Sequence, residues 1–183
     1  MTSLAAVYPY ILAYKISNGI EHRHLADFKD AATRDNFGKY ILEKLGGTKA
    51  ADDDWYKLPD LNKFYAANTE ARKHGHVYDL PDHDLGIPPH AVHFHILAFK
   101  VGNGETYRQL SDFVSVEKRT DFVNYLKALK APKEGDWYKL PGKKEIDDAI
   151  AEALKLGGDV YDLPYAPHVR DLPSLDSESE ALE

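Results

Sequence analysis

The sequence predicts an α+β fold made of two tandem copies of one small unit, packed on each other with pseudo-twofold symmetry. Three blocks recur in the same order along the 183 residues. They are residues 11–15 with 96–100, 54–59 with 136–141, and 77–81 with 160–164, at offsets of 85, 82 and 83. Because the offsets change only between blocks, the length differences fall where loops are expected. A period this long that occurs twice indicates an internal duplication of a compact unit and not a solenoid.

The repeats also set the domain boundaries. The first copy spans residues 1–81, the second spans 93–164, and a proline-rich linker, 82–92, joins them. A linker this short keeps the two copies close together. Residues 165–183 form a tail with one basic and five acidic side chains, which we expect to be mobile.

Each copy begins with a predicted β-hairpin. Asn18-Gly19 and Asn103-Gly104 each lie between apolar runs, and Asn-Gly favours the type I′ turn of a two-residue hairpin loop. A two-residue loop fixes the register of the strands. This register predicts four cross-strand pairs, which are Tyr14 with Arg23, Leu12 with Leu25, Phe99 with Arg108, and Leu97 with Leu110.

The other elements follow from the spacing of apolar residues. Helical periodicity predicts a first helix over residues 30–45 and 116–130. The recurring Trp-Tyr-Lys-Leu-Pro block is short, aromatic and closed by proline, which is typical of a strand. A second helix follows in each copy, with Gly75 and Gly157 in the position of a C-terminal cap, and Val-Tyr-Asp-Leu-Pro forms the last strand. The predicted order in each unit is strand, strand, helix, strand, helix, strand.

Composition and charge exclude several classes of protein. The chain is 43% hydrophobic and 29% charged, as globular proteins are, and its lack of cysteine excludes disulfides, thiolate metal sites and cysteine nucleophiles. The tail contributes four of the seven excess negative charges, and no segment concentrates Lys and Arg, which argues against a nucleic-acid partner. No apolar run reaches 18 residues and the start has no basic signal-peptide region, so we expect a cytoplasmic protein without a membrane partner.

Histidine pairs are the first candidate site. Six of the nine histidines form three His-x-His pairs, and two of these pairs, His22/His24 and His93/His95, lie on or beside predicted strands. Side chains at i and i+2 of a strand share a face, so each pair can supply two ligands to a divalent metal such as zinc. The alternative is a structural or surface role, because the second copy has no histidine at the positions of His22 and His24.

The repeated aromatic and basic block is the second candidate site. Strand alternation puts Trp and Lys of this block on one face, which forms a platform for a flat or anionic ligand. The candidate binding residues are Arg23, Arg108, Trp55, Lys57, Trp137 and Lys139, with Arg34 and Arg119 adding charge from the first helix of each copy. The alternative is that the aromatic strand packs into the core while lysine extends to water.

Recurring acidic residues are interpreted as structural. Asp27 and Asp112 come shortly before the first helix of each copy, where a helix-capping or turn role is expected. Asp79 and Asp162 are expected to bind neighbouring backbone. The run 52–54 lacks the spacing of a calcium-binding loop and is predicted to be a solvated loop.

The favoured function is a small, non-catalytic binding or interaction protein, such as a regulator, an inhibitor or an immunity-type protein. Phosphate-loop, dinucleotide-binding and nucleophile-elbow motifs are absent from the sequence, so no cofactor is expected. The expected partner is another protein or a small ligand, bound through the histidine-rich surface of the first copy and the linker. Two alternatives remain: a metal-dependent hydrolase with His-x-His ligands, and a single-stranded nucleic-acid binder that stacks bases on Trp55 and Trp137.

Overall fold

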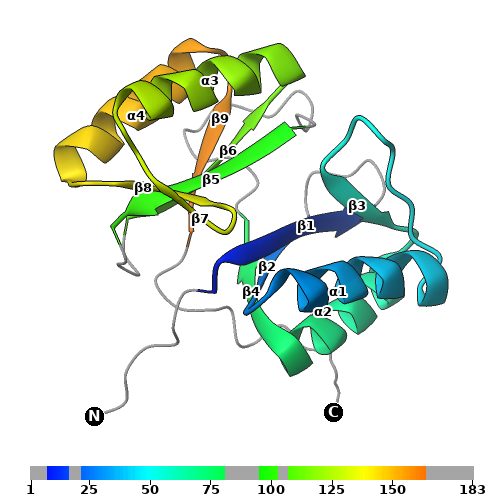
Figure 1. Ribbon diagram of the computed structural model, residues 1–183. Helices are drawn as coiled ribbons and strands as arrows, with labels where there is room; N and C mark the ends of the chain where they lie inside the picture. The colour runs from blue at the N-terminus through cyan, green and yellow to red at the C-terminus, as the bar shows by residue number, and fades with distance from the viewer. Residues whose placement is uncertain (1–7, 17–21, 81–94, 103–106, 164–183) are drawn as a thin grey trace, which may run out of the picture.

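The computed structural model describes residues 8–16, 22–80, 95–102 and 107–163, and these form two α+β halves (Figure 1). The first half has the predicted order of elements. Its strands and helices are β1 (Tyr10–Ile16), β2 (Arg23–Phe28), α1 (Ala31–Lys44), β3 (Trp55–Leu58), α2 (Leu61–His74) and β4 (Gly75–Asp79).

The second half repeats this order with one addition. Its elements are β5 (His95–Val101), β6 (Arg108–Phe113), α3 (Val116–Ala128), β7 (Lys133–Glu134), β8 (Trp137–Leu140), α4 (Lys143–Lys155) and β9 (Asp159–Asp162). The additional strand, β7, is two residues long and pairs with β8 at the edge of the sheet. The linker 82–92, the tail 165–183 and most residues of the hairpin loops lie outside the described residues.

Both sheets have the same strand topology. The strand order is β3-β1-β2-β4 in the first half and β7-β8-β5-β6-β9 in the second. The first two strands of each half are antiparallel, the third (β3 or β8) lies parallel to the first, and the last is antiparallel to the second. Both helices of a half cover one face of its sheet, and the uncovered faces of the two sheets pack against each other (Figure 1). The molecule therefore has four layers, helix, sheet, sheet and helix.

Three apolar cores hold these layers together. One lies between each sheet and its helices, and it includes Tyr14 and Phe37 in the first half and Phe99 and Phe122 in the second. The third lies between the sheets and is built from small and large side chains of both halves, namely Ala13, Leu25, Trp55, Leu80, Ala98, Leu110, Trp137, Tyr161 and Leu163. Burial of this third core ties the halves into one body.

The hairpin register differs from the predicted register by one residue. Tyr14 pairs with His24 and Lys15 with Arg23, and the second hairpin follows the same pattern with Phe99 opposite Gln109 and Lys100 opposite Arg108. In the observed register an odd number of residues separates each pair of opposite residues, for example Lys15 and Arg23. A two-residue Asn-Gly loop requires an even number. The four predicted pairs are therefore wrong. Since a slip of one residue exchanges the faces of a strand, Tyr14 turns toward the helices and Arg23 toward the opposite sheet.

The helix caps also differ from the sequence interpretation. Asp30, Asp60 and Ser115 cap α1, α2 and α3, since each side chain accepts a hydrogen bond from the backbone N–H three residues on, at 2.8, 2.9 and 3.2 Å. Asp27 and Asp112 do not cap a helix. They are fully buried strand residues whose carboxylates bind side chains of the last strand, as described below.

Glycines at the ends of the second helices have two distinct roles. Gly157 has a positive φ of 86°, and its backbone N–H donates to Leu154, as expected of a C-terminal cap. Gly75 ends α2 in extended backbone, and a Cβ there would lie 1.7 Å from the Asp27 carbonyl oxygen. Its counterpart Gly158 meets the Asp112 carbonyl oxygen in the same way, at 2.5 Å. These glycines let the last strand approach the second strand closely.

Candidate functional site

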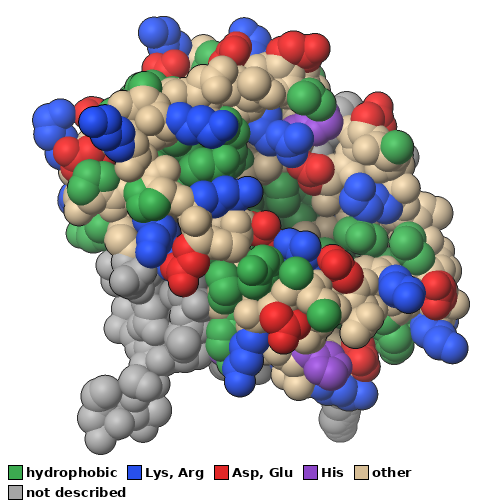
Figure 2. Space-filling view, viewed as in Figure 1, with side chains coloured by type: hydrophobic (Ala, Val, Ile, Leu, Met, Phe, Trp, Pro, Cys, Tyr) green, Lys and Arg blue, Asp and Glu red, His purple; other side chains and the backbone are tan. Residues whose placement is uncertain are grey.

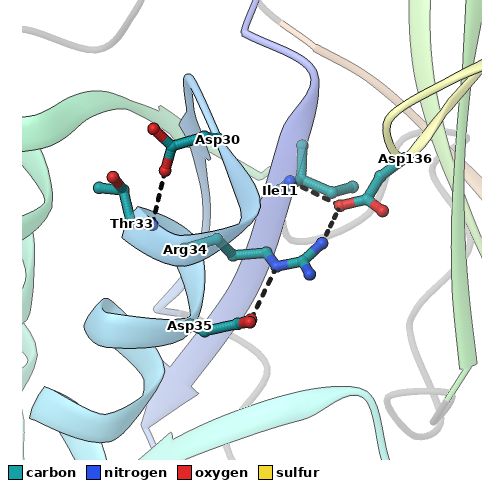
Figure 3. A network of polar contacts seen from close by, with 6 residues as sticks. All are labelled: Ile11, Asp30, Thr33, Arg34, Asp35 and Asp136. Carbon is teal, nitrogen blue, oxygen red and sulfur yellow. Dashed lines mark hydrogen bonds and ion pairs between the residues drawn. The ribbon is translucent and has the colours of Figure 1, made fainter.

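Two aspartate residues clasp the halves together. Asp136, just before β8, accepts hydrogen bonds through one carboxylate oxygen from the Ile11 backbone N–H at 2.9 Å and from Arg34 of α1 at 2.7 Å (Figure 3). The backbone N–H of Asp136 donates to the Pro9 carbonyl at 2.7 Å. Because β3 pairs with β1 only from Ala13 onward, the edge of β1 at Ile11 has no strand beside it and takes this carboxylate as a partner.

The second clasp is the reciprocal of the first. Asp54, just before β3, accepts from the Ile96 backbone N–H at 2.9 Å and from Arg119 of α3 at 2.6 Å. The two hydrogen bonds that the carboxylate of each clasp accepts therefore have equivalents in the opposite direction. This reciprocity is the pattern expected of an interface with a pseudo-twofold axis.

A pocket of about 510 Å³ lies between the two clasps. Figure 2 shows the seam between the halves, where basic and acidic side chains lie around a recess with hydrophobic surface inside. Most of its lining consists of equivalent residues from the two halves, namely Ile11 and Ile96, Leu12 and Leu97, Ala13 and Ala98, Arg34 and Arg119, Asp54 and Asp136, and Tyr56 and Tyr138. The volume falls within the range that small-molecule sites occupy.

The charged groups of the pocket balance one another. Three cations, Arg34, Arg119 and Lys133, face three carboxylates, Asp35, Asp54 and Asp136. Burial lowers the pKa of Arg34, but Asp136 outweighs this effect and the pKa lies above its usual value. Burial also raises the pKa of the phenols of Tyr56 and Tyr138, and nearby Asp35 adds to the effect at Tyr56. At neutral pH the pocket thus offers fixed charges of both signs and two neutral hydroxyl groups.

The two sides of the pocket differ at one pair of helix positions. Gly38 of α1 lies against Tyr56, and a Cβ on this glycine would meet the Tyr56 hydroxyl oxygen at 2.7 Å. The equivalent residue of α3 is Val123, whose side chain lines the pocket. Lys133 of β7 lines the pocket and lies over the Tyr138 ring, 5.5 Å from its centroid, whereas Lys49 lies over the equivalent Tyr56 ring at 5.8 Å and does not line the pocket. A ligand in this pocket therefore meets two chemically different ends.

Two buried polar chains, whose residues do not line the pocket, also cross the interface. Arg23 donates to the Tyr161 hydroxyl at 2.9 Å, and this hydroxyl donates to Asp112 at 3.0 Å. In the reciprocal chain, Arg108 donates to Tyr78 at 3.2 Å and Tyr78 donates to Asp27 at 3.0 Å. Each guanidinium also lies over the ring of its tyrosine, 4.9 and 4.8 Å from the centroid.

These chains serve the interior. Burial first, and then the neighbouring carboxylate, raise the pKa of Tyr78 and Tyr161 far above the usual value, so both phenols keep their protons and act as donors. Arg23 and Arg108 are only 1% and 2% exposed. The predicted binding residues Arg23 and Arg108 thus join the two halves through tyrosines that the sequence interpretation left unassigned.

The other predicted binding residues are also brought together between the sheets. Strand alternation is as predicted, with the tryptophans in the core between the sheets and the following tyrosines toward the helices. Trp55 is 0% and Trp137 is 1% exposed, so neither indole face is open to a base from solvent. Lys57 pairs with Asp53 at 3.2 Å, and Lys139 pairs with Glu134 at 3.3 Å.

The acidic run 52–54 is only partly the solvated loop that was predicted, since Asp52 is exposed while Asp53 and Asp54 have specific partners. Asp53 is buried, with one carboxylate oxygen accepting from the Trp55 backbone N–H at 2.9 Å and the other facing Lys57. Asp54 forms the second clasp. Both carboxylates directly precede β3, which is anchored by Trp55 in the core between the sheets, and this anchoring fixes their positions.

The three candidate metal ligands that the structure describes, His22, His24 and His95, have different surroundings. His22 is exposed and lies beside Phe64, whereas His24 is buried between Asn68 at 2.8 Å and Asp79 at 2.5 Å. His95 is buried on β5, and His93 lies outside the described residues. Within the part of the chain that the structure describes, no group of three His, Asp or Glu side chains is arranged to hold a metal ion.

The pair of His24 and Asp79 has a counterpart without histidine. Gln109 donates to Asp162 at the equivalent place in the second half. The polar pair therefore belongs to the fold, and Asp79 and Asp162 each bind a side chain of the second strand of their half.

Comparison of the chain with protein-family models, with curated proteins and with solved structures finds no match. None of the described helices has the length and apolar character needed to cross a bilayer. The clasp aspartates were missed as functional residues, although both open the repeated Asp-Trp-Tyr-Lys-Leu-Pro block, and that recurrence is the signal that identifies them.

Proposed function

We propose that the protein is a non-catalytic binding protein whose small ligand occupies the pocket between the two halves. The observation that supports this most is the pocket of about 510 Å³, lined by equivalent residues of both halves and flanked by the two clasps. Sites that bind small molecules commonly combine apolar walls with a few fixed polar groups, and they often lie between structural units.

The chemistry of the lining supports a particular class of ligand. Since cations and carboxylates are present in equal number, a ligand with a strong net charge gains little from the pocket as a whole. A zwitterionic or neutral polar molecule with a flat apolar part matches it better, because such a part can lie against Tyr56, Tyr138 and the apolar walls. The difference between Gly38 and Val123 favours one orientation of this ligand.

Native mass spectrometry of the protein recovered from its own cells tests the proposal. Wild-type protein is expected to carry a small molecule in near-stoichiometric amount. Val123→Trp fills the pocket and should lose this molecule. Lys127→Trp, one helical turn further on the exposed face of α3, is the matched control and should retain it.

Two results would count against the pocket. One is a wild-type spectrum without a bound small molecule, and the other is an identical bound mass in wild type and Val123→Trp. The same spectra report a bound protein, which is the other partner that the sequence leads us to expect.

A further inference from the structure

The clasps neutralise most of the charge in the pocket between the halves. Arg34 pairs with Asp136 at 2.7 Å, and Arg119 pairs with Asp54 at 2.6 Å. In the first clasp the Arg34 guanidinium lies between Asp136 and a second carboxylate, that of Asp35, which its Nε contacts at 3.2 Å (Figure 3). One guanidinium balances only one of these two carboxylates. The first clasp and Asp35 together thus have one negative charge in excess, whereas the second clasp is neutral.

The matching positive charge comes from the other half. Lys133 of β7 lines the pocket, and its ammonium lies 5.5 Å from the centroid of the Tyr138 ring. Within the part of the chain that the structure describes, no ion pair includes Lys133. The equivalent Lys49 lies outside the pocket lining, and its ammonium donates to the Ala50 carbonyl at 3.5 Å.

Neither of these two charges has an equivalent in the pocket. The residue of α3 that corresponds to Asp35 is Thr120, which follows Arg119 as Asp35 follows Arg34, and it does not line the pocket. Asp35 and Lys133 are exposed side chains of the lining, so they lie where the pocket opens to water. The pocket is therefore negative on the side of the first half and positive on the side of the second.

Each side of the pocket also has a phenol hydroxyl available to a ligand. Tyr56 and Tyr138 line the pocket, and among the described residues no hydrogen bond includes either hydroxyl. Burial and then Asp35 raise the pKa of Tyr56, so this phenol lies within the influence of the carboxylate of its own half. Burial also raises the pKa of Tyr138. Both phenols keep their protons at neutral pH, and a phenol can accept a hydrogen bond from an ammonium or donate one to a carboxylate.

We infer that the ligand of this pocket is a zwitterion with its ammonium and carboxylate groups at opposite ends, as in a short unmodified peptide or an ω-amino acid. This inference rests on the proposed function, because it requires a small molecule between the halves. The ammonium is bound on the side of Asp35 and Tyr56, and the carboxylate on the side of Lys133 and Tyr138.

Other ligands match this distribution of charge less well. A neutral polar molecule leaves both Asp35 and Lys133 without a counter-charge. A molecule with its ammonium and carboxylate on one carbon atom can pair with only one of them, because the two charged side chains belong to opposite halves. A zwitterion that lies across the seam pairs with both, and its polarity fixes its direction.

Chemical labelling of the bound molecule tests the class of ligand. Wild-type protein is recovered from its own cells and denatured, and the released molecule is treated with acetic anhydride, which acetylates amines, or with acidic methanol, which esterifies carboxylates. The molecule should take both labels. Acid hydrolysis distinguishes the two sources, because a peptide yields amino acids and an ω-amino acid stays intact.

Titration calorimetry of the dialysed protein with the released molecule tests the direction of binding. Asp35→Asn and Lys133→Met should each weaken binding about fivefold, the upper end for ion pairs open to water. Acetylating the amine should weaken binding to wild type but cause no further loss in Asp35→Asn. Esterifying the carboxylate should likewise weaken binding to wild type but cause no further loss in Lys133→Met.

Two control variants change similar side chains outside the pocket. Lys49→Met removes the lysine that lies over the equivalent ring, and Asp121→Asn neutralises an exposed carboxylate of α3. Neither side chain lines the pocket, so both variants should bind the released molecule as wild type does.

The outcomes separate this inference from the function on which it rests. A released molecule that takes one label or none would overturn the inference, and so would unchanged binding to Asp35→Asn or Lys133→Met, or the opposite pairing of labels and variants. In each of these cases a molecule that is lost from Val123→Trp still supports the pocket as the site. If wild type releases no molecule, or if Val123→Trp releases the same one, the proposed function fails and the inference fails with it.

Discussion

Replacing Asp136 by alanine tests the reciprocal clasps most directly. The substitution removes two hydrogen bonds to one carboxylate, from the Ile11 backbone at 2.9 Å and from Arg34 at 2.7 Å. Hydrogen bonds to charged groups contribute about 1.5–3 kcal/mol each. Since the side chains of Arg34 and Asp136 are 25% and 27% exposed, we take the lower end and expect a loss of about 3 kcal/mol in the free energy of unfolding.

Urea unfolding followed by circular dichroism measures this loss. In a protein of this size each kcal/mol lowers the unfolding temperature by roughly 2–4 °C, so a thermal scan should show a decrease of roughly 6–12 °C. A double-mutant cycle with Arg34→Met should give a coupling of about 1 kcal/mol, the part that belongs to the ion pair. The remainder reports the uncapped Ile11 N–H.

Two further variants check the reasoning. Asp54→Ala removes the reciprocal clasp and should match Asp136→Ala within about 1 kcal/mol. Asp35→Ala removes the second carboxylate that pairs with Arg34. Because the Asp35 side chain is 67% exposed, this variant should lower the free energy of unfolding by less than about 0.5 kcal/mol. If Asp136→Ala is no less stable than Asp35→Ala, the clasps do not hold the halves together.

Three other predictions concern single side chains. The pKa of Lys15 is about 8 in the folded protein and 10.5 in the unfolded chain, so the free energy of unfolding should rise as the pH increases from 8 to 10.5. We expect a rise of about 1–2 kcal/mol after screening by water. A pH profile of wild type parallel to that of Lys15→Met would refute this. Gly75→Ala should destabilise by roughly 2–4 kcal/mol in urea, since its Cβ would overlap the Asp27 carbonyl, and a neutral effect would disprove the close approach. His24→Gln places in the first half the residue that the second half has at this position, and its free energy of unfolding should stay within about 1 kcal/mol of wild type. His24→Ala should lower the free energy of unfolding by about 2 kcal/mol. Equal losses in the two variants would show that the hydrogen bond to Asp79 contributes nothing.

The element order could be predicted because two copies of each apolar pattern were available. The first helices, predicted over 30–45 and 116–130, form over Ala31–Lys44 and Val116–Ala128. Their periodicity depends on core residues such as Phe37 and Phe122, which each copy places at the same point. Local pattern and tertiary packing agree in these segments, so sequence alone was sufficient.

The hairpin register could not be predicted from the turn residues. The Asn-Gly signal describes a local preference, whereas the register is decided by which side chains the core accepts on each face. Tyr14 has space among the helices, and Arg23 finds Tyr161 on the opposite sheet. The partner of Arg23 lies 138 residues away in the sequence, beyond the reach of any local pattern.

The candidate sites were hidden from the sequence for a related reason. The pocket and the clasps exist only where two halves meet, so no single repeat contains them. The recurring sequence blocks included the clasp residues, but they did not show which groups of the other half these residues contact.

The reciprocity of the contacts has a consequence for the single unit. One half contains both members of each contact type, with Asp54 and Arg34 for the clasp and Arg23 and Tyr78 for the buried chain. Its inner surface is thus self-complementary, and two identical units would meet with the same bonds as a homodimer. Linkage in one polypeptide makes the association of the two halves independent of concentration, and it allows the two sides of the pocket to differ, as they do at Gly38 and Val123.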